Sequence, residues 1–138
     1  MSHVIDHVAI RVSDLARSRK FYEAALAPLE FRVLYETGDE HGRGVALGRV
    51  GADDFAIHEP IASPGRDAVT HGVHVAFRAD DADSVKAFHA AAVAHGGHSI
   101  GEPGPRPEYS ERYFGAFVLD PDGNNIEAVW HAPGPLES

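Results

Sequence analysis

The stretches HVAIRVSD, residues 7–14, and HVAFRADD, residues 74–81, are two versions of one sequence. The alignment continues without a gap at an offset of 67 residues, and nine of the 21 positions from 7 to 27 are identical to their counterparts. Abundant alanine cannot produce His-Val-Ala-x-Arg followed by Asp and Phe at fixed spacing. Such self-similarity is the signature of a repeated structural unit. The sequence therefore predicts two copies of one module.

Each copy predicts a strand, a helix and three further strands. Alternating apolar residues favour the strands, Ser13-Asp14 and Asp80-Asp81 are typical helix caps, and Pro28 and Gly96-Gly97 are typical helix ends. A strong turn signal, DPDG at 120–123, separates the last two strands. The expected strands are 4–12, 31–36, 44–49 and 53–59 in the first copy and 72–79, 98–101, 112–119 and 125–131 in the second.

These patterns predict one α+β domain over residues 1–138, with two tandem βαβββ modules. Module one covers about residues 1–60, a linker covers 61–71, and module two covers about 72–131. The proline-rich segment 101–109 is expected to lack regular structure, and a long loop in a compact domain is often functional.

The composition excludes several classes of protein. The net charge of −9 argues against a nucleic-acid partner, because phosphate binding needs a concentrated basic surface. There is no cysteine, hence no disulfide or thiolate site. Without a long apolar run or a signal-peptide pattern, we expect no membrane partner and a cytoplasmic location. The ten histidines raise the question of a metal site.

The repeat places two histidines, His7 and His74, at equivalent points of equivalent strands. Glu127 lies in an apolar strand, and a carboxylate on a buried face needs a partner, for which a divalent cation is one candidate. A solvated face, or an ion pair with Arg11 or Arg78, is the alternative.

The segments DHVAI at 6–10, SDLxxSxxFY at 13–22 and FVLDPDGNNIE at 117–127 resemble the vicinal oxygen chelate superfamily, which includes glyoxalase I, extradiol dioxygenases and bleomycin-binding proteins. The resemblance extends over about residues 3–131. It implies modules whose mixed sheets curl around a metal cleft, with ligands from first and fourth strands. By position these ligands are His7, His74 and Glu127. A fourth ligand, usual in glyoxalase I, is replaced by Ala56, with His58 the nearest alternative on that face.

The resemblance also implies chemistry. Three ligands leave positions open for substrate oxygens on Zn, Ni, Mn, Co or Fe(II). We expect a glyoxalase-type lyase, isomerase or thiol transferase acting on a small oxygen-rich substrate. An extradiol-type ring-cleaving dioxygenase and a metal-free drug- or metabolite-binding protein are the alternatives.

Further site residues are expected near the metal. Glu127, His58 and Tyr113 are candidates for proton transfer, and Arg106, Tyr109 and Tyr113 for substrate binding. A homodimer is expected because two modules leave open sheet edges. The sequence leaves open whether the cleft forms within one chain or between two.

Overall fold

The computed structural model describes residues 4–39 and 42–136. The elements of the first module, in chain order, are β1 (Val8–Arg11), α1 (Leu15–Leu26), the short 3-10 helix η1 (Ala27–Leu29), β2 (Arg32–Asp39), β3 (Gly42–Arg49) and β4 (Ala52–His58). Those of the second are β5 (His74–Arg78), α2 (Ala82–Ala94), β6 (His98–Pro105), β7 (Tyr113–Leu119) and β8 (Asn125–His131).

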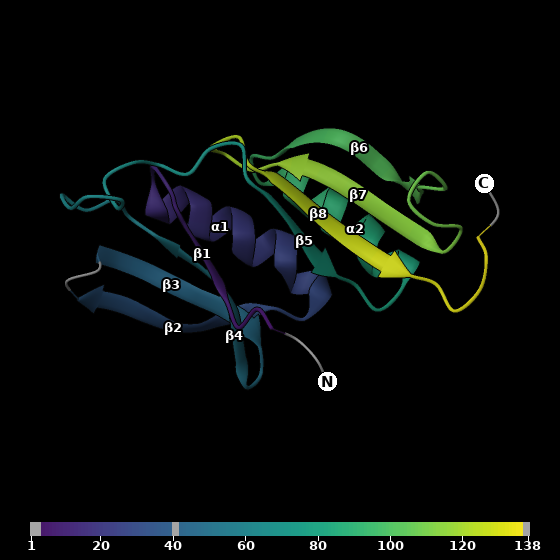
Figure 1. Cartoon of the computed structure of the whole chain (residues 1–138), viewed down its shortest axis with the longest axis horizontal. Coiled ribbons are helices and arrows are strands. Elements are labelled where there is room, and N and C mark those ends of the chain that lie inside the picture. Colours follow the sequence, from purple (N-terminus) through teal and green to yellow (C-terminus); the bar gives the residue numbers. More distant parts are fainter. Residues whose placement is uncertain (1–3, 40–41, 137–138) are drawn as a thin grey trace.

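Each module forms one four-stranded mixed sheet. The strand orders are β1-β4-β3-β2 and β5-β8-β7-β6, and in each sheet the first strand pairs in parallel with the fourth. Figure 1 shows the two modules side by side, the first in purple and blue, the second in teal, green and yellow. The predicted pair of βαβββ modules is confirmed.

Both long helices begin where the sequence predicts. Asp14 and Asp81 are the N-caps, and their side chains accept hydrogen bonds from the backbone N–H groups of Arg17 and Ser84. The first helix ends at Leu26, and Pro28 belongs to η1.

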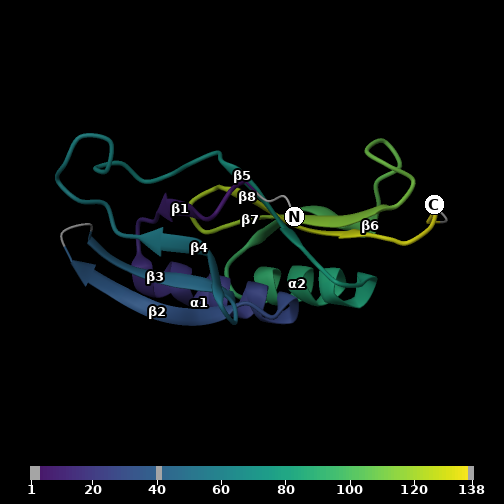
Figure 2. The same cartoon turned by 60° about the horizontal axis from the view of Figure 1, so that its bottom comes forward.

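The two modules share one hydrophobic core. Helices α1 and α2 pack against each other, and Figure 2 shows them on one side of the molecule. The rings of Phe55 in the first module and Phe77 in the second lie 5.2 Å apart. Neither α1 nor α2, the long helices of the described residues, has the length and apolar character needed to cross a bilayer.

The expectation that residues 101–109 lack regular structure is wrong for the first part of that segment. Strand β6 continues to Pro105 and includes Pro103. It lies at the edge of its sheet, where a proline's missing N–H costs no ladder hydrogen bond. Its register against β7 shifts on both sides of Gly101, which accommodates the irregular sequence.

The turn after β7 joins the modules. The buried Asp120 accepts backbone hydrogen bonds from Asp122 and Asn124, at 2.9 and 2.8 Å. It also accepts a hydrogen bond from the hydroxyl of Tyr22, which is fully buried in α1. The predicted turn therefore also anchors the second module on the first.

Tyr22→Phe is expected to lower the free energy of unfolding by about 1.5–3 kcal/mol, the usual contribution of a hydrogen bond to a carboxylate. Urea unfolding measures this change. In Tyr35→Phe the lost hydroxyl is exposed, so a loss under about 0.5 kcal/mol is expected there. Equal losses in both variants would contradict a special role for the buried contact.

Candidate metal centre

The candidate site lies on the face of the second sheet that points away from the hydrophobic core. In β5 the exposed His74, Ala76 and Arg78 alternate with residues that face the core. The register places Ala76 beside Glu127 of β8. Since paired residues point to the same face, Glu127 lies on the face that His74 also occupies.

Glu127 is the buried charged group at the centre of this face. Its side chain is 1% exposed, whereas that of His74 is 51% exposed. Its Oε1 lies 2.8 Å from His74 Nε2, and its Oε2 accepts a hydrogen bond from the Tyr113 hydroxyl. Of the two interpretations offered by the sequence, the structure supports a buried carboxylate with specific partners.

Tyr113 is held as a hydrogen-bond donor. Burial raises the pKa of its hydroxyl, and the hydrogen bond to Glu127 and that carboxylate's charge raise it further. The hydroxyl therefore keeps its proton at neutral pH and points it at the carboxylate. Tyr109, which is 61% exposed, packs its ring edge-on against Tyr113, with the ring centroids 5.0 Å apart.

His7 lies on the other module, just before β1. Its Nδ1 is 2.8 Å from Asp6 Oδ1, and this hydrogen bond is the main cause of its raised pKa; the charge of Asp53 adds to it. Among residues 4–39 and 42–136, no three His, Asp or Glu side chains of one chain are close enough to hold a metal ion. One chain thus brings His74 and Glu127 together, and His7 does not join them.

The register of the first sheet tests the prediction that Ala56 occupies the position equivalent to Glu127. Ala9 pairs with Ala56 as Ala76 pairs with Glu127, so the methyl group of Ala56 occupies the position equivalent to the carboxylate. His58 lies two residues further along β4, beside Gly44 of β3.

Arg106 is already engaged within its own loop. Its guanidinium donates to the carbonyls of Glu102, Gly104 and Pro105 and stacks over Phe117, 5.4 Å from the ring centroid. These contacts order the segment before Tyr113, so the structure gives Arg106 a loop-ordering role beside the expected role in substrate binding.

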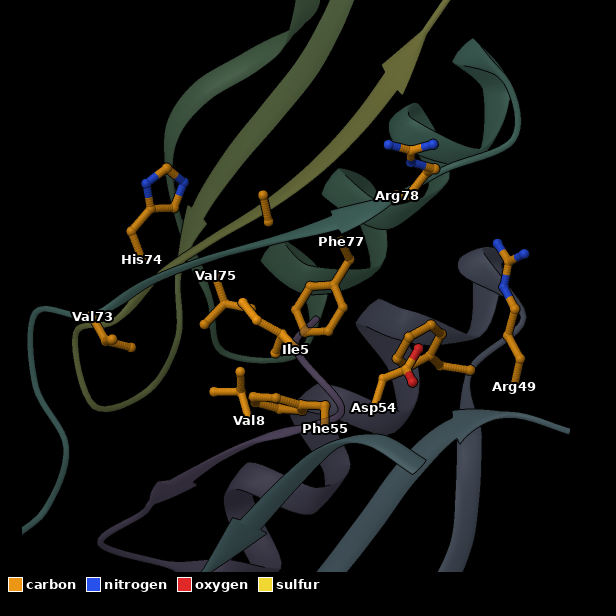
Figure 3. A pocket seen from close by; sticks show the side chains of 12 residues that line it. Ile5, Val8, Arg49, Asp54, Phe55, Val73, His74, Val75, Phe77 and Arg78 are labelled. Carbon is orange, nitrogen blue, oxygen red and sulfur yellow. The ribbon is translucent and has the colours of Figure 1, made fainter. Parts of the chain in front are cut away.

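An apolar groove of about 700 Å³ runs between the modules, lined by Ile5, Val8, Phe31, Arg49, Asp54, Phe55 and residues 73–78. Figure 3 shows His74 at one end and Arg49 and Arg78 at the other, with the rings of Phe55 and Phe77 between them. His74 lines the groove and Glu127 does not, so the groove lies beside the His74–Glu127 pair.

Comparison with known proteins identifies the family. A family model described as the glyoxalase/bleomycin resistance protein/dioxygenase superfamily matches residues 4–128. The chain belongs to this superfamily. The resemblance noted in the sequence is thereby confirmed.

Similar members of the superfamily include an enzyme and a solved structure of nearly the same length. A lactoylglutathione lyase of Haemophilus influenzae is 34% identical over 124 residues, covering 89% of each chain. A glyoxalase/bleomycin resistance protein from Albidiferax ferrireducens is 32% identical, with a TM-score of 0.73 over 93% of this chain and 98% of that one.

Glyoxalase I from Zea mays differs in length. It is 27% identical with a TM-score of 0.66, and the match covers 91% of this chain but 45% of the maize chain. The maize chain therefore has room for two units of this size.

The donor set on the second sheet fits a divalent metal. Imidazole nitrogen and carboxylate oxygen suit Zn, Ni, Mn, Co and Fe(II). A cation held by both groups would take the place of their direct hydrogen bond and would neutralise a carboxylate buried from water.

Proposed function

We propose that this protein is a divalent-metal-dependent enzyme of the glyoxalase type that works as a homodimer. His74 and Glu127 of one chain and His7 of a second chain would hold the metal. The observation that carries the proposal is the buried Glu127 carboxylate hydrogen-bonded to the half-exposed His74.

Two further observations support a site shared between chains. His7 lies on the outer face of the first module, so it is available to a second chain. The maize relative, about twice as long, has room in one chain for the two units that a homodimer would supply. Closed two-fold pairing is also the commonest arrangement of soluble oligomers.

The residues of the chain define the chemistry. When bound, the metal would supply a Lewis acid for neighbouring oxygens of the substrate. Glu127 is the carboxylate placed to accept a proton, and Tyr113 holds the other oxygen of that carboxylate by donating its hydroxyl. His58 is a second candidate base, and Tyr109 and Arg106 would border the substrate from the loop before Tyr113.

The lactoylglutathione lyase relative indicates the first substrate to test, the adduct of glutathione with methylglyoxal, which is an isomer of lactoylglutathione. We expect protein purified with a divalent metal to convert it, and chelation to abolish the conversion until metal is restored. Absorbance of the thioester product measures the reaction. Protein that retains no metal and gains no activity from any of the five metals would contradict the proposal.

Ring-cleaving oxygenation is a second candidate, because Ala56 leaves a set of two histidines and one carboxylate. Such a set with open positions is typical of non-haem Fe(II) oxygenases. Oxygen consumption by the Fe(II)-loaded protein with catechols, without lyase activity, would favour this candidate.

A further inference from the structure

A single row of residues crosses the first sheet on the face that carries His7. The register pairs Ala9 with Ala56, Ala56 with Ala46, and Ala46 with Tyr35. Paired residues on neighbouring strands point to the same face of a sheet, and His7 is two residues before Ala9. Tyr35 therefore projects from the same face as His7.

A β-bulge brings a carboxylate to this face. The register between β3 and β4 shifts between Leu47 and Arg49, so that residues 53 and 54 together oppose the single residue Gly48. Regular alternation would give Asp53 the parity of Phe55, which faces the core. A bulge bends the strand and re-aims side chains, and bulges are frequent beside active sites.

Tyr35 orients the Asp53 carboxylate, which the bulge turns away from the core. Its hydroxyl donates to Asp53 Oδ2 at 2.6 Å, although the tyrosine itself is 50% exposed. This hydrogen bond lowers the pKa of Asp53, and the nearby charge of His7 lowers it slightly more. Asp53 is therefore an oriented carboxylate, and the pairing of Val8 with Phe55 places its strand beside the segment that carries His7.

The two modules thus carry similar sets of side chains built from different positions. Each set comprises a histidine, a carboxylate and a tyrosine that donates to the carboxylate. The sets are His74, Glu127 and Tyr113 in the second module and His7, Asp53 and Tyr35 in the first.

We propose that Asp53, held by Tyr35, is the carboxylate that the first module contributes to the metal site, in place of the ligand absent at Ala56. This inference rests on the proposed function, because the site is completed by His74 and Glu127 of a second chain. It gives the site two carboxylates, one from each chain, and assigns a role to the exposed Tyr35–Asp53 pair of the first module.

Calorimetric titration of chelator-treated protein with Co²⁺ tests the proposal without measuring activity. We expect Asp53→Asn, which removes the charge and keeps the side-chain shape, to raise the Kd for Co²⁺ by more than about 100-fold, because losing an outer-shell partner of a ligand already costs about 10- to 100-fold. Tyr35→Phe keeps the Asp53 carboxylate but removes the hydrogen bond that orients it, so a smaller increase in the Kd is expected. Asp67→Asn removes the same charge from the exposed linker and should leave the Kd unchanged.

The outcomes separate this inference from the proposed function. If wild-type protein binds Co²⁺ and Glu127→Gln does not, but Asp53→Asn binds within threefold of wild type, the role of Asp53 is overturned and the metal site stands. A loss in Asp54→Asn equal to or larger than that in Asp53→Asn also overturns it. If wild-type protein binds no Co²⁺, both proposals fail. Far-ultraviolet circular dichroism of each variant confirms that it is folded.

Discussion

Mixed in equal amounts, the His7→Ala and Glu127→Gln variants are expected to regain about one quarter of the wild-type metal sites, although each variant alone binds almost none. The expectation follows from a site shared between chains. In a dimer of the two variants, one site combines both substitutions. The other combines the intact His7 of one chain with the intact His74 and Glu127 of the other.

The size of the recovery follows from random pairing. About half of the re-formed dimers contain one chain of each variant, and each of these has one intact site out of two. The variants are unfolded and refolded together, and metal bound after dialysis is measured by elemental analysis. Parallel assays of the mixture should show activity recovered in the same proportion.

A matched control uses two substitutions from the same half of the site. Mixing His74→Ala with Glu127→Gln leaves one defect in every site of every dimer, so no recovery is expected. Recovery in this control would indicate exchange of metal by some other route. No recovery in the first mixture, with dimers shown by sedimentation, would mean that His7 does not share a site with the other chain's ligands.

Much of the fold could be predicted because it is encoded locally and twice. The repeated HVA segment at the two first strands predicted the modules, and the capping aspartates Asp14 and Asp81 predicted where the helices begin. The sequence singled out Glu127 because it is a carboxylate in an apolar strand and would need a partner if buried. The structure shows it buried, with His74 and Tyr113 as its partners. Its metal-binding role stays a prediction.

The rest depended on register, which the sequence does not display. The strand predicted at 98–101 was too short, because the prolines at 103 and 105 are loop signals unless the position of β6 at the sheet edge is known. The sequence predicted Arg106 only as a substrate-binding residue, since the carbonyls that bind its guanidinium become neighbours only when the loop folds. Asp53 was not singled out at all, because strict alternation gives it the parity of the core.

Gly48→Ala is expected to lower the free energy of unfolding by at least about 3 kcal/mol, the upper end of the usual cost of overpacking. The cost is high because the added methyl group would collide with backbone atoms, which cannot rotate away as a flexible side chain can. A Cβ at Gly48 would lie 1.7 Å from the Ala52 carbonyl oxygen and 3.2 Å from the Asp53 Cα. Gly48 is not among the glycines with positive φ, so the requirement is space rather than backbone conformation. The added methyl group must push β3 and β4 apart where residues 53 and 54 oppose one glycine.

Urea unfolding measures the loss, and Gly38→Ala is the matched control, since its Cβ would meet nothing within 4 Å. A change under about 0.5 kcal/mol is expected there. The bulge also connects this prediction to the metal site. A Gly48→Ala protein that still folds should bind Co²⁺ more weakly, because displacing residues 53 and 54 separates Asp53 from Tyr35. Stability equal to wild type would mean that β4 runs regularly past Gly48, and a regular strand would turn Asp53 towards the core and away from His7.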